Sequence, residues 1–191
     1  MKFIKMKYTY KTYSTMTKKF IVTIALALLP TLFFAQSVFD KYEGEEVVTS
    51  VIVSPKMFQM MGNIKMDAKD KEKQKFVELV KKLDNLKVFT TSNTKLAADM
   101  KLTADKYIKS AKLEELMRAN DKGSNIKIMI KSGGKETQVK ELLMFIEGAG
   151  KNSETVLFSL TGDFDLNEVS LLTDKMNISG GDAIKKATKN R

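Results

Sequence analysis

The sequence lacks cysteine, histidine and tryptophan altogether, and it has only two prolines and two arginines in 191 residues. The absence of histidine and cysteine excludes the Ser-His-Asp and Cys-His groupings of nucleophilic enzymes, and it excludes ordinary structural zinc sites. Because no disulfide can form, side-chain packing alone must stabilise the fold. Proton transfer near neutral pH would require a carboxylate, a lysine or a tyrosine with a shifted pKa. We therefore expect no enzyme activity, no catalytic residue and no cofactor.

The scarcity of arginine also argues against nucleic acid as a partner. Arginine binds phosphates and base edges through two hydrogen bonds at once, and the chain has only Arg118 and Arg191. The formal net charge is +10, but residues 1–35 hold six of the 33 basic residues and no acidic one. The remaining 27 basic and 23 acidic residues give a net charge of only +4. We therefore expect no nucleic-acid binding.

Residues 1–35 have the pattern of a secretory signal peptide. Two lysines precede an apolar run over residues 20–35, and the pattern predicts cleavage between Ala35 and Gln36. The run is shorter than the ~20 residues that a membrane-spanning helix typically needs. A retained membrane anchor is the alternative that the pattern leaves open.

This leader predicts a protein that is exported, either to the periplasm or to the outside of the cell. The chain has no cysteine, so we do not expect a lipoprotein. Met16 would begin a more compact signal peptide, and we expect it to be the true start. Residues 36–180 are then expected to form one domain, and residues 181–191 a basic flexible tail.

Apolar periodicity, helix caps and turn residues predict the elements of this domain. Ser54 and Pro55 are typical of a helix start, and Asp165 with Glu168 has the spacing of a capping box. The two glycines of residues 132–134 are expected to supply the positive φ angles of a hairpin turn. The expected elements are a strand at 46–53, helices at 55–62 and 70–83, a strand at 86–90, helices at 93–110 and 113–119, strands at 125–131, 137–147 and 154–161, and a helix at 165–176.

This order of elements predicts an α+β fold with a single, mainly antiparallel sheet. We expect about five strands, of which the last three form a meander, and amphipathic helices packed on the sheet. Residues 142–146 are apolar on both faces of their strand. That strand should therefore lie at the centre of the sheet, with its second face covered by a helix or by a partner chain.

Five stretches together resemble an uncharacterised family of bacterial envelope proteins, the domain of unknown function 4252 family. They are FDKYEGEEVVTSVIVSPKMFQMM from Phe39, LKVFTT from Leu86, LEELMRANDKGSNIKIMIK from Leu113, VKELLMFIEG from Val139 and SLTGDFDLNEVSLL from Ser159. The resemblance spans nearly all of the chain after the leader, and its best marker is Leu160-Thr161-Gly162-Asp163. It implies an exported protein whose family has no established catalytic residues. Members of the family include lipoproteins, and this chain departs from them by lacking the cysteine.

Met57, Met60 and Met61 are the candidate metal ligands, because soft thioethers suit copper(I). Spacings of three and four are also those of a buried helix face, and methionine is a common core residue. We therefore favour a core position or a partner groove over a metal site.

Asp163, Asp165 and Asn167 imitate the start of a calcium-binding loop. The sixth and twelfth positions of the loop are Glu168 and Asp174, where glycine and glutamate are needed. We therefore favour a turn followed by a helix cap.

The remaining charged residues give no convergent pattern. The carboxylates that we considered for acid–base chemistry are Glu114, Glu115, Glu141, Glu147 and Asp163. The lysines of residues 69–82 and of the tail (Lys185, Lys186, Lys189, Arg191) would bind anionic lipid headgroups only as a peripheral contact. We expect both groups to be solvated surface charges.

Taken together, the sequence favours a non-enzymatic, exported module that binds another envelope protein or itself through an apolar sheet face. One alternative is a small-molecule or copper(I) carrier, or a carboxylate-based enzyme, with a pocket between the sheet and the helices. The other is a factor held on a membrane surface by its lysines, with membrane contact at most peripheral.

Overall fold

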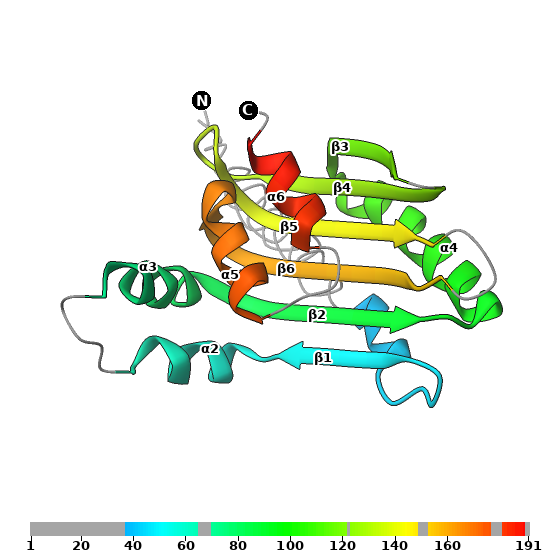
Figure 1. Ribbon diagram of the computed structural model, residues 1–191, viewed down its shortest axis with the longest axis horizontal. Helices are drawn as coiled ribbons and strands as arrows, with labels where there is room; N and C mark the ends of the chain where they lie inside the picture. Colours follow the sequence, from blue (N-terminus) through cyan, green and yellow to red (C-terminus); the bar gives the residue numbers. More distant parts are fainter. Residues whose placement is uncertain (1–36, 65–69, 122, 149–152, 177–180, 190–191) are drawn as a thin grey trace, which may run out of the picture. The chain divides into compact units, whose positions relative to one another are not determined.

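A six-stranded antiparallel sheet organises the molecule (Figure 1). The computed structural model describes residues 37–64, 70–121, 123–148, 153–176 and 181–189. The strands lie in the order β1-β2-β6-β5-β4-β3, and every neighbouring pair is antiparallel. They are β1 (Thr49–Val53), β2 (Leu83–Thr91), β3 (Glu114–Asp121), β4 (Ser124–Ser132), β5 (Gln138–Glu147) and β6 (Thr155–Asp165). The predicted α+β class, the meander and the central position of β5 are confirmed, although the sheet has six strands where five were expected.

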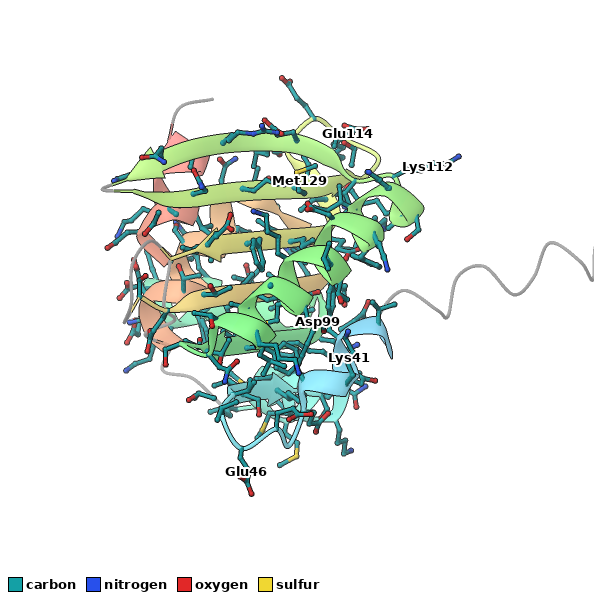
Figure 2. All side chains as sticks on the ribbon, turned by 90° about the vertical axis from the view of Figure 1, so that its right-hand side faces the viewer. Lys41, Glu46, Asp99, Lys112, Glu114 and Met129 are labelled. Atoms are coloured by element: carbon teal, nitrogen blue, oxygen red, sulfur yellow. The ribbon has the colours of Figure 1, made fainter. Side chains whose placement is uncertain are left out.

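Helices cover both faces of this sheet. They are the 3₁₀ helices η2 (Ser37–Tyr42) and η3 (Leu166–Glu168), and the α-helices α2 (Pro55–Gly62), α3 (Lys71–Val80), α4 (Thr94–Ala111), α5 (Val169–Met176) and α6 (Gly181–Lys189). α4 lies on one face, against β2, β5 and β6, whereas α5 and α6 lie on the opposite face (Figures 1 and 2). No helix of the described residues is both long and apolar enough to cross a membrane.

Short polar side chains define the helix starts, as the sequence predicts. The Ser54 hydroxyl accepts a hydrogen bond from the Met57 N–H at 3.3 Å, and Pro55 occupies the first turn of α2. Asp70 and Asn93 cap α3 and α4 in the same way, at 3.0 Å each. These caps satisfy backbone donors that would otherwise lack partners.

The pleat of the strands divides the core into two parts. We call the side covered by α3, α5 and α6 the α5 face; there Leu86, Met144 and Phe158 belong to one continuous apolar cluster that Leu79, Leu172 and Ile184 of the helices complete. We call the other side the α4 face. Its buried residues include Phe89, Leu143, Phe145 and Leu157 from the strands, Phe39 and Tyr42 from η2, and Met100, Ala104 and Tyr107 from α4.

One predicted helix is wrong. Residues 113–119 were expected to be helical, because leucine, glutamate, methionine, arginine and alanine all favour helices. They form most of β3 instead, which pairs with β4 from Glu114 opposite Ile130 to Asp121 opposite Ser124. Lys112 adopts a left-handed conformation with φ of 55° and ends α4 just before the strand. Pairing with β4 therefore overrides the local helical preference.

The end of the chain is also more ordered than expected. The segment 181–191 was expected to be a flexible tail, but α6 spans Gly181–Lys189 and buries Ala183 and Ile184 in the apolar cluster. Two apolar residues next to each other on one turn are a weak sequence signal, which explains the error. The helix predicted at 165–176 begins with the 3₁₀ turn η3 and continues as α5.

Glycine matters at two positions of the sheet. Gly133 and Gly134 are in a hairpin connection as expected, but their φ angles are not positive; instead, a Cβ at Gly133 would lie 2.8 Å from the Gln138 carbonyl oxygen. Gly162 of β6 has φ of 153°, and a Cβ there would lie 2.3 Å from the Lys82 carbonyl oxygen. Glycine therefore allows the close approach of β6 to the start of β2.

Two strand starts differ from the expected ones. β1 begins at Thr49 rather than at residue 46, and β2 begins at Leu83 rather than at residue 86. The pairing of β2 with β6 shifts register between Leu83 and Asn85. The polar Asn85 thus marks a bulge within the strand and not its beginning.

Candidate functional site

Exposed apolar side chains gather at one end of the described structure. Of its eight exposed large hydrophobic residues, seven lie between residues 38 and 64. We define the β1–α2 surface by six of them: Val47, Val51, Ile52, Met57, Met60 and Ile64. Clusters of exposed apolar residues are typical of interaction sites, whereas scattered ones are ordinary.

α2 presents the methionines of this surface to solvent. Met57 and Met60 are 50% and 59% exposed, whereas Phe58 and Gly62 are buried and Met61 packs against the core cluster. Of the two favoured expectations, a core position or a partner groove, the core position is therefore wrong for Met57 and Met60. The reason is that α2 follows the edge strand β1, so only one side of the helix meets α3 and β2. The three methionines divide between two sides of the helix, which does not favour a single copper(I) ligand set.

β1 is the other half of the surface and forms an edge of the sheet. Four of its five residues are exposed, and only Val53 is buried. Val51 and Ile52 are neighbours and therefore point to opposite faces, yet both are exposed. The segment before the strand is held by the Thr91 hydroxyl, which donates a hydrogen bond to the Val47 carbonyl oxygen at 2.7 Å.

Glu141 is the buried carboxylic acid of the α4 face. Its side chain on β5 is only 5% exposed, and the Tyr107 hydroxyl of α4 donates a hydrogen bond to it at 2.7 Å. Burial raises the pKa of Glu141, an effect that the hydrogen bond from Tyr107 and the charge of Lys131 partly offset. Burial also raises the pKa of Tyr107, and the Glu141 carboxylate adds to the shift. The pair joins α4 to the sheet and does not open onto solvent.

A second polar group joins η2 to α4. The Tyr42 hydroxyl lies 2.8 Å from the Asp99 carboxylate and 2.9 Å from the Thr103 hydroxyl, and the Lys41 ammonium lies 2.5 Å from Asp99. The hydrogen bonds from Lys41 and Tyr42 lower the pKa of Asp99. Because Lys41 and Tyr42 of η2 both bind the Asp99 Oδ2 atom of α4, this group is best explained as a structural link between the two helices.

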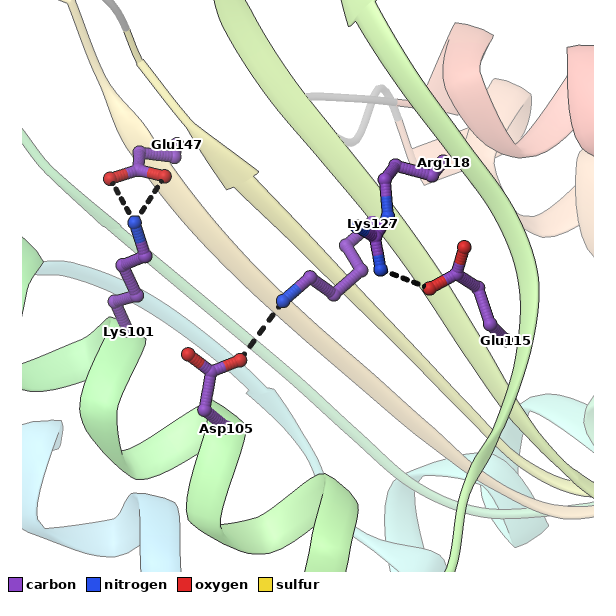
Figure 3. A network of polar contacts seen from close by, with 6 residues as sticks. All are labelled: Lys101, Asp105, Glu115, Arg118, Lys127 and Glu147. Carbon is purple, nitrogen blue, oxygen red and sulfur yellow. Dashed lines mark hydrogen bonds and ion pairs between the residues drawn. The ribbon is translucent and has the colours of Figure 1, made fainter.

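A pocket of about 470 Å³ opens near the start of α4, between the helix and the ends of β5 and β6. Lys101 lies at its wall and contacts both carboxylate oxygens of Glu147 at 2.7 Å (Figure 3). Further along α4, Asp105 pairs with Lys127 of β4 at 3.0 Å. The volume is within the range of small-ligand sites, but the charged groups at the wall neutralise each other.

The candidate carboxylates lie in separate places. Glu115 pairs with Arg118 (Figure 3), Glu114 accepts a hydrogen bond from Ser132, Glu141 from Tyr107, and Glu147 and Asp163 pair with Lys101 and Lys140. They do not combine into an acid–base pair. Among the described residues, no group of three or more acidic side chains is placed to hold a metal ion.

The calcium-loop residues have structural roles. Asp163 binds Lys140 and Gln138, at 2.5 Å each, and the hydrogen bond from Lys140 lowers its pKa. Asp165 accepts a hydrogen bond from the Asn167 N–H at 2.9 Å and caps η3. The favoured helix cap is therefore confirmed, but the expected turn is wrong, because Asp163 lies within β6 and the strand continues to Asp165, directly before η3.

Several predicted positions lie outside the described residues. They include the cleavage site at Ala35 and Gln36, the rest of the leader, Lys69 and Arg191. Of the lysine-rich face, Lys73 pairs with Asp70, Lys82 with Glu168 and Lys185 with Asp174. The paired carboxylates reduce the local positive charge around these lysines, which weakens the attraction to an anionic membrane surface.

A comparison with known protein families identifies the family to which the chain belongs. The profile of a family described as "Domain of unknown function (DUF4252)" matches residues 42–172. The chain belongs to this family. The DUF4252 match begins at the end of η2 and ends within α5, so it includes the whole sheet and the β1–α2 surface. No curated protein and no solved structure matches the chain.

Sequence reasoning missed the exposure of the β1–α2 surface, although one signal was present. Residues 51–53 are apolar at three consecutive positions, a pattern that is typical of a strand buried on both faces. An edge strand that binds a partner has the same composition. Only the strand order separates the two interpretations.

Proposed function

We propose that the DUF4252 domain of this chain is an exported, non-enzymatic module that acts by binding a protein in the cell envelope, either a different protein or a second copy of itself. The observation that carries this proposal is the concentration of exposed apolar side chains at the β1–α2 surface. The signal-peptide pattern of residues 1–35 supports export.

The geometry of the charged groups supports a binding role over a catalytic one. Carboxylates with a shifted pKa mark many enzyme sites, but Glu141, whose pKa is raised by burial, is enclosed between α4 and β5 and accepts a hydrogen bond from Tyr107. Methionine, by contrast, is frequent at protein-binding surfaces because its flexible thioether adapts to different partners. Met57 and Met60 are therefore expected to contact the partner directly.

The experiment uses the lack of cysteine in the chain. The variant Met57→Cys has a single thiol, which can carry a photoactivated crosslinker into the envelope fraction of the source organism. The matched control is Leu102→Cys, because Leu102 is similarly exposed, at 60%, but lies on α4. We expect a discrete protein adduct from Met57→Cys and none from Leu102→Cys. Equal adducts from both variants, or none from either, would contradict the proposal.

A further inference from the structure

The two edges of the sheet are built differently. β3 carries Glu115 and Arg118, and its pairing with β4 shifts register between Glu115 and Met117. β1 has no charged residue and no proline, and it pairs with β2 without a shift. Charges and bulges normally protect an edge strand from pairing with another chain. The edge at β3 is thus protected, whereas the edge at β1 has no neighbouring strand among the described residues and presents its backbone donors and acceptors there.

We infer that β1 pairs in antiparallel fashion with β1 of a second copy of this chain, about a two-fold axis at Val51. This inference rests on the proposed function, because it names the partner of the β1–α2 surface. The two six-stranded sheets would then join into one continuous sheet. Addition of a strand to an exposed edge is a common mode of recognition, in which backbone hydrogen bonds provide much of the affinity.

The length of β1 fixes the register. A five-residue strand overlaps fully with an antiparallel copy of itself only when its central residues, here Val51, lie opposite each other. Thr49 then lies opposite Val53 of the second copy, and Ser50 lies opposite Ile52. Residues that lie opposite each other share a face of the sheet, so the exposed Val51 side chains meet across the axis.

The charges on either side of the strand fit an antiparallel pair. Glu46 lies five residues before Val51 and Lys56 lies five residues after it, and both are exposed. In Figure 2, Glu46 projects away from the body of the molecule. A two-fold axis at Val51 brings each Glu46 toward Lys56 of the other copy, whereas a parallel pair would bring the two Glu46 side chains together. Within the described residues, neither Glu46 nor Lys56 forms an ion pair.

α2 extends the contact beyond the strand. It lies in line with β1 at the same border of the sheet (Figure 1). In an antiparallel pair, the segment after one β1 lies beside the segment before the other, so Met57 comes near Val47 of the second copy. Five paired residues alone would bury less than the ~1,200 Å² of a stable interface, and these apolar residues enlarge it. The same arrangement explains why Val47, which is 54% exposed, is apolar.

Sedimentation velocity of the purified protein over a range of micromolar concentrations tests the inference. We expect a monomer–dimer equilibrium that the variant Val51→Lys weakens by at least about tenfold, because like charges then face each other across the axis. Leu102→Lys, at a position on α4 that is 60% exposed against 45% for Val51, should leave the equilibrium unchanged. Equal circular dichroism spectra and melting temperatures would show that Val51→Lys remains folded.

Charge reversal tests the register separately. Glu46→Lys or Lys56→Glu alone should weaken the dimer by about tenfold, since two exposed ion pairs become two repulsive pairs. The double variant should recover most of the affinity. A dimer that survives Val51→Lys, or a double variant that is weaker than both single variants, would overturn the inference.

The failure of this inference is distinguishable from the failure of the proposed function. A protein that stays monomeric, while Met57→Cys still forms an adduct with a different envelope protein, overturns self-pairing and leaves the proposed function standing. A monomeric protein without any adduct overturns both. An adduct with the mass of two copies of the chain supports both.

Discussion

The α5 face and the α4 face of the sheet are stabilised in different ways. On the α5 face, the helices complete one large apolar cluster, and Thr173 of α5 is a buried polar residue of these helices. On the α4 face, the single long helix α4 and the short η2 cover the strands, and the buried set includes Glu141, Thr103 and Ser159. The burial of apolar surface stabilises a fold but does not depend on the relative orientation of the groups, whereas hydrogen bonds require specific distances and angles. The α5 face therefore provides most of the stability, and the α4 face fixes where its helix lies.

The polar groups of the α4 face are fully engaged. Among the described residues, no buried side-chain nitrogen or oxygen lacks a hydrogen-bond partner. Ion pairs continue the network toward the rim of the helix, where Lys101 meets Glu147 and Asp105 meets Lys127. A satisfied buried network specifies one arrangement, because any displaced arrangement leaves polar groups unpaired.

The strongest test of the comparison removes a large side chain from the α5 face. Phe158 of β6 is fully buried in the apolar cluster. Phe158→Ala should lower the free energy of unfolding by about 4 kcal/mol, since it loses apolar burial and leaves a cavity. Urea unfolding followed by circular dichroism measures the change. Leu102→Ala on the exposed side of α4 should change it by less than about 0.5 kcal/mol; a Phe158→Ala effect as small as this would refute the role given to the α5 face.

A smaller effect is expected from removal of one hydrogen bond on the α4 face. Tyr107→Phe keeps the ring, which packs against Phe39 at 5.1 Å between centroids, but removes the donor to Glu141. We expect a loss of about 2 kcal/mol near neutral pH, because a buried carboxylate is left without its donor. The loss should be smaller at about pH 4, where the carboxyl group is largely protonated. An equal loss at both pH values would show that Glu141 does not carry the effect.

The smallest effect, and the most specific, concerns the charge of Glu141. Burial raises the pKa of this carboxyl in the native state, so the native protein holds the proton more tightly than the unfolded chain does. Its contribution to stability is therefore fully present below the unfolded pKa of about 4.3 and is lost as the pH rises toward the native pKa. Glu141→Gln keeps an acceptor for Tyr107 and cannot ionise.

The variant Glu141→Gln should therefore melt at a higher temperature than the unmodified protein near neutral pH, and at a similar temperature at about pH 4. Thermal melts followed by circular dichroism at both pH values measure this difference. A constant difference between the two proteins across the pH range would contradict the burial of an ionisable Glu141.

Much of the fold follows from local signals in the sequence. The cap at Ser54, the helix starts near Asp70 and Asn93 and the alternation of the strands could be predicted, because each depends on neighbouring residues. β3 was not readable, since its residues favour a helix and become a strand only through pairing with β4. α6 was missed because two buried residues, Ala183 and Ile184, gain their energy from a cluster assembled by distant segments.

The candidate site was less predictable than the fold. The sequence identified Met57 and Met60 as notable, but burial and exposure of a helix face give the same spacing. Which side of α2 meets the protein depends on β1 being an edge strand, and that is a property of the strand order. In the same way, the sequence does not distinguish Glu141 from the other glutamates. Its burial and its hydrogen bond from Tyr107 depend on how α4 packs on the sheet.

The position of β2 has a consequence for how the chain reaches its native state. β2 lies between β1 and β6 in the sheet. Residues 83–91 therefore cannot pair on both sides until residues 155–162 have been synthesised. The meander β4-β5-β6 can form from near neighbours, but the N-terminal pair of strands closes the sheet across a long loop, which is a slow kind of step. We therefore expect a nascent chain to remain unfolded until nearly all of it has been synthesised. This delay is compatible with the proposed export, because a chain that is still unfolded can pass through a narrow channel.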